Sequence, residues 1–223
     1  MENVHITSSF DKDLGEIKAR VVKMGTLVAS QLSEGMLMLA NPDAARVEAL
    51  VKNDRKVNGM NTSIAKHAER LIALRQPMAL DLREALSPIN IATELERIGD
   101  HAKSAAKRSQ KMLRGAIPPE FQALLSAISG LLQTQIDDVL RAYDKSDLAL
   151  AAHVREQDRQ VDDLNRKVFE LSVLALSDGK RDAATLMNVV LVSRNLERVG
   201  DHIVNIARYV NQIVTGDDLK ATE

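Results

Sequence analysis

An internal repeat constrains the fold of this chain more than any other feature of its sequence. Residues 95–101, Leu-Glu-Arg-Ile-Gly-Asp-His, return 101 positions later at residues 196–202 with a single Ile-to-Val change. A second pair of related segments lies upstream, at residues 54–61 and 158–165, and both begin with Asp-Arg. Two matching pairs in the same order indicate that the two halves of the chain are copies of one structural unit.

The composition of the chain favours helices over strands. Of 223 residues 45% are hydrophobic, but only 2% are aromatic and none is Trp, so aliphatic residues and eight Met must fill the core. Such side chains suit interlocking helices. Apolar residues also recur at spacings of three and four, as in Leu14, Ile17, Val21, Met24 and Val28. This is the period of a helical stripe, and it predicts an all-α protein.

Residues that commonly end or begin helices divide the chain into six long segments. Pro, Gly and short polar runs occur near residues 41, 76, 118, 146 and 178. The predicted helices are 8–40, 43–75, 78–114, 119–144, 147–177 and 181–214. Because short connections make neighbouring helices antiparallel, we expect two tandem antiparallel three-helix bundles, residues 1–116 and 117–223.

The charge balance and the missing residue types exclude several classes of protein. Thirty basic and thirty-one acidic residues give no positive field for a polyanion, and few aromatic rings are present to stack on bases, so nucleic acid is not an expected partner. No cysteine is present for disulfides or thiolate metal sites. No run approaches the roughly 20 apolar residues that cross a bilayer, and the first residues lack a signal-peptide pattern. We expect a cytoplasmic protein.

The predicted hairpins bring the acids of the repeated segments together. If the helices on either side of Pro77 fold back on each other, Asp100 lies opposite Asp54, and the second half has the same register about Gly179. Residues four apart lie about 5–6 Å apart on one helix face, so each hairpin presents four oxygen-bearing side chains. The first-repeat cluster is Asp54, Asn58, Glu96 and Asp100, and the second-repeat cluster is Asp158, Asp162, Glu197 and Asp201.

Grouped carboxylates need positive charge. Two unit charges about 5.5 Å apart repel by about 3 kcal/mol at an effective dielectric constant of about 20. Hard divalent or trivalent cations bind carboxylate oxygens, and helical bundles are a frequent place for carboxylate metal centres. The alternative is a surface ion-pair network with Arg97, Arg198, Arg55 and Arg159. The twofold repetition and the matched register favour metal sites at both clusters.

The sequence leaves two classes of function open. One is a regulatory interaction protein, in which a metal stabilises structure or is sensed. The other is a carboxylate-bridged metalloenzyme in a helical bundle, which would need an open coordination position and a general acid or base. His101 and His202 point about 100° away from the preceding acids around the helix. The Gly-x-Ser-x-Gly and His-Glu-x-x-His motifs do not occur, which favours the non-enzymatic class.

The chain resembles the PhoU family of bacterial phosphate-transport regulatory proteins. The resemblance lies in the two three-helix repeats, the acid-x-x-x-Asp pairs on the second and third helix of each repeat, and the motif Leu-Glu-Arg-Ile/Val-Gly-Asp-His. It spans essentially the whole chain. It implies a non-enzymatic negative regulator of the phosphate-starvation (Pho) response, which links the Pst phosphate ABC transporter to the PhoR sensor kinase and modulates phosphate uptake.

The resemblance also implies partners and metal ligands. The expected partners are the Pst transporter ATPase, the PhoR kinase and a second copy of the chain in a homodimer, with membrane association only through partners. Iron or zinc, including multinuclear clusters, is the expected cofactor. Asn58 departs from the family pattern, because it carries a neutral amide where the pattern has Asp. The family pattern places the metal ligands at Asp54, Glu96, Asp100, Asp158, Asp162, Glu197 and Asp201.

Overall fold

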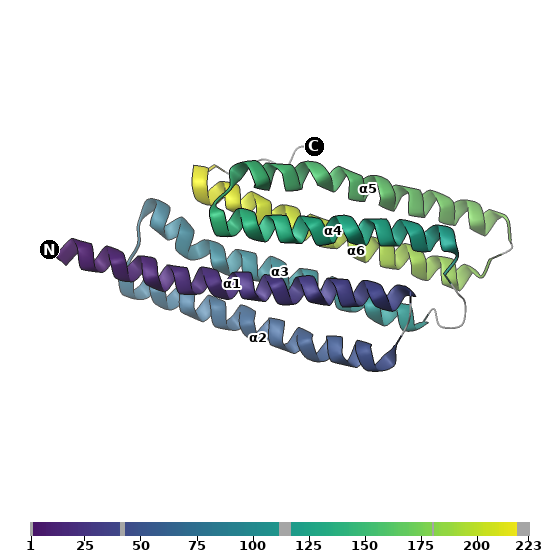
Figure 1. Cartoon of the computed structure of the whole chain (residues 1–223), viewed down its shortest axis with the longest axis horizontal. Coiled ribbons are helices and arrows are strands. Elements are labelled where there is room, and N and C mark those ends of the chain that lie inside the picture. Colours follow the sequence, from purple (N-terminus) through teal and green to yellow (C-terminus); the bar gives the residue numbers. More distant parts are fainter. Residues whose placement is uncertain (1, 41–42, 112–116, 180, 218–223) are drawn as a thin grey trace.

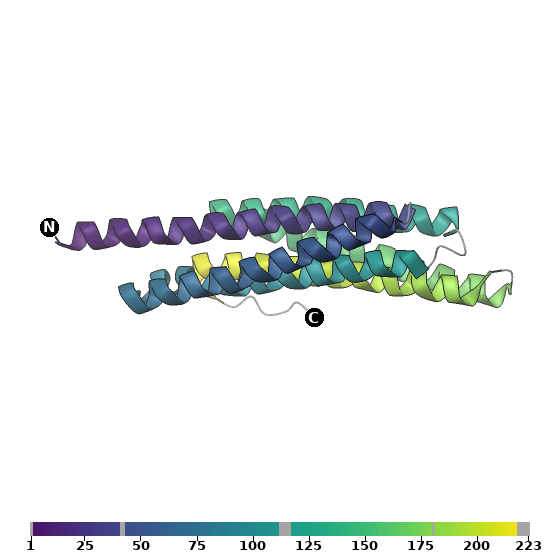
Figure 2. The ribbon, with the colours of Figure 1, turned by 90° about the horizontal axis from the view of Figure 1, so that it is seen from below.

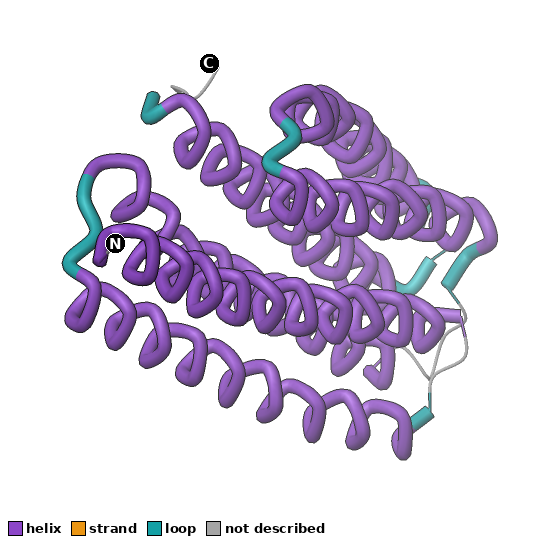
Figure 3. Tube along the Cα trace, turned by 60° about the vertical axis from the view of Figure 1, so that its left-hand side comes forward, coloured by secondary structure: helices purple, strands orange, loops and turns teal. Residues whose placement is uncertain are grey.

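The chain folds into long helices, as the apolar periodicity predicts (Figure 3). A computed structural model describes residues 2–40, 43–111, 117–179 and 181–217, and this part of the chain contains no strand. The helices are α1 (Glu2–Ala40), α2 (Ala44–Arg75), α3 (Ala79–Lys111), α4 (Pro119–Lys145), α5 (Leu148–Ser177) and α6 (Ala183–Thr215). The all-α prediction is confirmed, although α1 begins six residues before its predicted start at residue 8. The predicted helix end at residue 114 and the domain boundary after residue 116 lie outside the described residues.

Short capped turns connect the helices of each repeat. At the start of α5 the Asp147 side chain accepts a hydrogen bond from the Leu150 backbone N at 3.0 Å, and at the start of α6 Asp182 accepts one from the Thr185 N at 2.8 Å. Such caps satisfy backbone donors that a helix leaves unpaired. Gly179, between α5 and α6, has a φ of +64°, a left-handed conformation that glycine adopts without strain. The predicted turn at Gly179 therefore sets the α5–α6 hairpin.

Each repeat is a three-helix bundle, and the two bundles pack side by side. Helix α3 packs on α6 and α1 on α4, whereas α2 and α5 contact only helices of their own repeat. Figure 1 shows α2 and α5 along the two outer edges, and Figure 2 shows the elongated molecule from below. One cluster of buried apolar residues draws members from all of these helices. The two repeats consequently share a hydrophobic core.

Helix α3 continues through Pro88, which cannot donate a backbone hydrogen bond to the carbonyl of Glu84. The hydroxyl of Ser87 donates to that carbonyl instead, at 3.1 Å. This local replacement keeps the carbonyl paired, so α3 extends far enough to carry the repeated motif. None of the described helices combines the length and the apolarity that crossing a bilayer requires.

The shared core predicts a large cost for truncating a central α3 side chain. Leu95 is fully buried, and Leu95→Ala should lower the free energy of unfolding by about 3 kcal/mol through lost burial and a residual cavity. That corresponds to a melting temperature about 9 °C lower for a chain of this length. Leu86→Ala is the control on the same helix, because Leu86 is 42% exposed. Equal melting temperatures for the two variants would contradict the assignment of α3 to the core.

Candidate metal site

The second-repeat cluster forms where the hairpin register predicts it. Asp158 and Asp162 lie on α5, and Glu197 and Asp201 lie on α6. Burial, and then the nearby charges of the other three carboxylates, raise the pKa of Asp158 to about 7. Burial and the charges of Glu197 and Asp201 also raise the pKa of Asp162. The hairpin thus holds four carboxylates close enough for each to oppose the ionisation of its neighbours.

A glycine makes room for the deepest of these carboxylates. A Cβ atom added at Gly200 of α6 would lie 2.6 Å from Oδ1 of Asp158 and 3.5 Å from a methyl of Leu132 in α4. In the first repeat, a Cβ at Gly99 would instead lie 3.0 Å from Oε1 of Gln31. The same glycine of the repeated motif therefore admits a carboxylate in one repeat and an amide in the other.

The two α6 carboxylates of the second-repeat cluster pair with arginines of their own helix. Glu197 contacts Arg194, and Asp201 lies 3.9 Å from Nη1 of Arg198. Both arginine side chains are more than half exposed, and exposed pairs of this kind contribute little to stability. The ion-pair alternative thus holds for Arg198, and in the first repeat for Arg97, whose Nε lies 3.8 Å from Oε2 of Glu96. Arg194 is a partner that was not predicted.

The α5 carboxylates have no such partner. In the part of the chain that the structure describes, neither Asp158 nor Asp162 forms an ion pair with Lys or Arg. Grooves of about 510 Å³ and about 440 Å³ open beside the cluster, the first lined by Glu197 and Asp201, the second by Asp158, and both by Asp162. Arg208 lies near enough to lower the pKa of Asp158, but burial and the three other carboxylates outweigh it. It lines the second groove together with Arg155 and Arg159. Four oxygen donors suit a hard cation. No three acidic or histidine side chains among the described residues form a ready coordination sphere, so binding would require Glu197 and Asp201 to turn from their arginines.

The first-repeat cluster contains a lysine. The Nζ atom of Lys103 donates to Oδ2 of Asp54 at 2.6 Å and to Oδ1 of Asp100 at 2.6 Å. Burial opposes the charged lysine, but these two hydrogen bonds and the charges of the same two carboxylates together outweigh it and raise the Lys103 pKa. Glu96 lies nearby, with a pKa raised by burial and then by the charge of Asp100, whereas Asn58 is exposed. Three of the four predicted residues thus lie together around an ammonium group.

Lys103 was not among the predicted site residues, although its position in the sequence carries a signal. It follows Asp100 by three residues, a spacing that puts both side chains on one helix face. The equivalent position in the second repeat, three residues after Asp201, is Val204. A comparison of the two repeats beyond the conserved motif would have shown this difference in charge.

The repeated histidines lie at the contact between α3 and α6. The rings of His101 and His202 stack with centroids 5.4 Å apart. Nδ1 of His101 lies 3.2 Å from Oδ1 of Asn195, and Nδ1 of His202 lies 2.7 Å from Oε2 of Glu94. Glu94 and Asn195 occupy equivalent positions one residue before the repeated motif. The histidines therefore join the repeats across an approximate twofold axis and point away from the acids, as their offset around the helix predicts.

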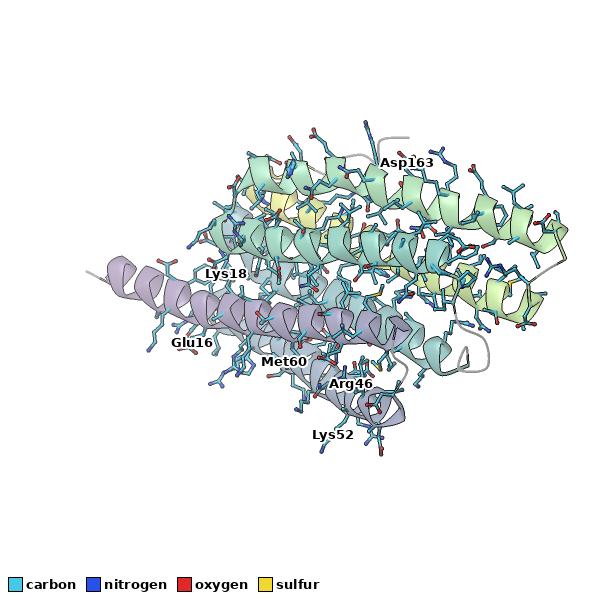
Figure 4. All side chains as sticks on the ribbon, turned by 45° about the vertical axis from the view of Figure 1, so that its right-hand side comes forward. Glu16, Lys18, Arg46, Lys52, Met60 and Asp163 are labelled. Atoms are coloured by element: carbon cyan, nitrogen blue, oxygen red, sulfur yellow. The ribbon has the colours of Figure 1, made fainter. Side chains whose placement is uncertain are left out.

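The raised pKa of Asp158 predicts a pH-dependent stability of the metal-free protein. A carboxyl that binds its proton more tightly folded than unfolded destabilises the fold as pH rises from about 4 to about 7. In chelator, the wild-type protein should lose about 2 kcal/mol between pH 5 and pH 8, after allowance for solvent screening. Asp158→Asn should flatten that profile in thermal melts. Asp163→Asn, at an exposed carboxylate on the same helix (Figure 4), should leave it unchanged; equal slopes for both variants would contradict the assignment.

Comparison with known proteins identifies the family. The family model of the PhoU domain matches the chain twice, at residues 21–109 and 125–210. A Caulobacter vibrioides relative is 33% identical over 96% of this chain and 94% of its own length, and one from Rhizobium meliloti is 31% identical over 97% and 91%. Both are named phosphate-specific transport system accessory protein PhoU homolog.

Solved structures agree with the sequence relatives. The crystal structure of PhoU from Pseudomonas aeruginosa superposes with a TM-score of 0.88 at 29% identity, covering 93% of this chain and all of that one. PhoU from Streptococcus pneumoniae gives 0.86 at 26% identity, covering 95% and 99%. With two matched domains, these relatives and the shared six-helix fold, the chain belongs to the PhoU family.

Proposed function

We propose that this protein is a non-enzymatic regulator of phosphate uptake that acts in the cytoplasm by contact with other proteins. The observation that carries the proposal is the match of both repeats to the PhoU domain. Its relatives bear the name of accessory proteins of the phosphate-specific transport system. The finer assignment is a homodimer that links the Pst transporter ATPase to the PhoR sensor kinase and represses the phosphate-starvation response.

Exposed apolar side chains on α5 support a function through protein contact. Phe169, Val173 and Leu176 recur at spacings of four and three, so they share a helix face, and all three are exposed. Phe169 is 58% exposed. An apolar stripe of this kind suits docking against a partner helix or groove. The stripe begins about two turns after Asp162, and Phe169 lines the same groove as Asp162, so a partner bound there would sit beside the cluster.

The proposal also assigns a hard metal cation, such as iron or zinc, to the second-repeat cluster. The support is the donor set of Asp158, Asp162, Glu197 and Asp201, in which burial and the neighbouring carboxylates outweigh the nearby charge of Arg208 and raise the pKa of Asp158 to about 7. A bound cation would supply the positive charge that offsets the repulsion between α5 and α6. The closure of this hairpin would then depend on metal, which links metal binding to the shape of the neighbouring stripe.

Metal should stabilise the protein if this assignment is right. A ligand that binds only the folded state adds about 2.7 kcal/mol at a free concentration 100 times its dissociation constant. The melting temperature should therefore fall when a chelator removes metal and rise again on titration with Zn²⁺, Mn²⁺ or Fe²⁺, as followed by scanning calorimetry. A melting curve that stays the same after complete metal removal would favour the ion-pair alternative for this cluster.

Deletion of the gene should switch on phosphate-starvation genes in phosphate-rich medium. The expected derepression follows from the loss of a repressor of kinase signalling, and a reporter fused to a phosphate-starvation promoter measures it. Reintroducing the wild-type gene should restore silence, and the purified protein should bind the transporter ATPase and the kinase. Silent reporters in the deletion strain together with no binding to either partner would refute the regulatory assignment.

Turnover of phosphate esters or peroxide by the metal-loaded protein would support the metalloenzyme alternative.

A further inference from the structure

We infer that Lys103 is a built-in cation that takes the place of a metal ion in the first repeat. In this chain the second-repeat cluster is then the one that takes metal. The inference rests on the proposed metal binding of the second repeat and deepens it, because it assigns different electrostatic states to the two copies. It departs from the family pattern, which implies metal ligands in both repeats.

The ammonium group of Lys103 occupies the position between Asp54 and Asp100 where a bridging cation would bind. Its Nζ lies 2.6 Å from an oxygen of each, the short distance of a charge-assisted hydrogen bond. The Lys103 side chain is 18% exposed and that of Asp54 8%, so water screens the pair weakly. A metal ion at the same oxygens would stand a few ångströms from the ammonium and be repelled by it. The lysine tethers α3 to α2 through the bonds that a metal would otherwise make.

The repeats differ at the two positions that decide their net charge. Where the first repeat has Lys103, the second has Val204, which lines the groove of about 440 Å³ beside Asp158. Where the second repeat has Asp162, the first has Asn58. Both differences act in the same direction, because one adds a positive charge to the first repeat and the other removes a negative one. Counted over the carboxylates and residue 103 or 204 alone, without the arginines that pair with either cluster, the first-repeat cluster carries a charge of −2 and the fully ionised second-repeat cluster −4.

Metal content measured on matched variants tests the inference. Protein stripped by chelation and then dialysed against Zn²⁺ or Mn²⁺ is assayed for metal per chain by elemental mass spectrometry. Asp162→Asn should lower the metal content, whereas Asp54→Asn should leave it at the wild-type value. Val204→Lys, which builds the first-repeat arrangement into the second, should abolish metal binding and make the melting temperature insensitive to chelator. Equal metal loss in Asp54→Asn and Asp162→Asn would overturn the inference.

Removing the lysine gives the converse test. Lys103→Met keeps the length of the side chain and removes its charge, which leaves Asp54 and Asp100 without a counter-ion. Its melting temperature in chelator should fall by about 5 °C or more, and added metal should restore most of the loss. Lys107→Met is the control, at an exposed lysine one turn further along α3. Equal melting temperatures for Lys103→Met and Lys107→Met, in chelator and in metal, would overturn the inference.

Failure of the proposed metal site is distinguishable from failure of this inference. If the wild-type protein binds no metal, the assignment of metal to the second repeat falls. The inference about Lys103 is then decided by Lys103→Met alone. It stands if metal stabilises this variant but not the wild-type protein, and it falls if metal stabilises neither. Should Lys103→Met fail to fold, the metal content of Val204→Lys and Asp54→Asn still decides the question.

Discussion

The contact between α3 and α6 is the constraint on which the rest of the molecule depends, and the repeated seven-residue motif makes it. Leu95 and Leu196 face the shared core, and His101 stacks on His202 across the approximate twofold axis. The acids of the same motif then point to the other side of each helix, toward α2 or α5. The seven-residue motif therefore supplies the core leucine, the stacked histidine and the acids of one helix. The packing of the repeats consequently determines where the acids lie.

In each repeat the fold brings carboxylates close enough to repel one another, and the two repeats offset this repulsion differently. Antiparallel hairpins place carboxylates opposite one another, which costs free energy unless a positive charge offsets it. The first repeat carries that charge within its own sequence, in Lys103, and holds it by two short hydrogen bonds. The second repeat pairs Arg194 with Glu197 and Arg198 with Asp201, and leaves Asp158 half-buried with its pKa raised to about 7. The stability of the α5–α6 hairpin therefore depends on pH and, in our proposal, on a cation bound from the solution.

Much of the fold, the second-repeat cluster and three of the four first-repeat residues could be predicted from the sequence, because they depend on local rules. Helical periodicity and turn residues predict the helix ends to within six positions, and equal distances from a turn predict which acids meet. Lys103, Arg194 and the partners of the histidines could not be found in this way. Lys103 and Arg194 each have several acids within reach, and their side-chain rotamers decide which acid they contact. His101 contacts Asn195 only because the two bundles pack in one orientation. No spacing within a single helix encodes that orientation.

An asymmetric pair of repeats suits a regulator better than a symmetric one. A ligand shifts a conformational equilibrium only by the difference in its affinity for the two states. A regulator therefore needs one part whose conformation changes on binding and another part that stays the same. A tethered ammonium gives the α2–α3 hairpin a constant charge and a constant geometry, and this hairpin is packed through α3 against α6. A cation that enters and leaves the α5–α6 hairpin would then change the exposed face of α5 relative to a fixed first repeat. The exposed apolar stripe lies on this α5 helix, so a partner docked there would bind the two states with different affinity.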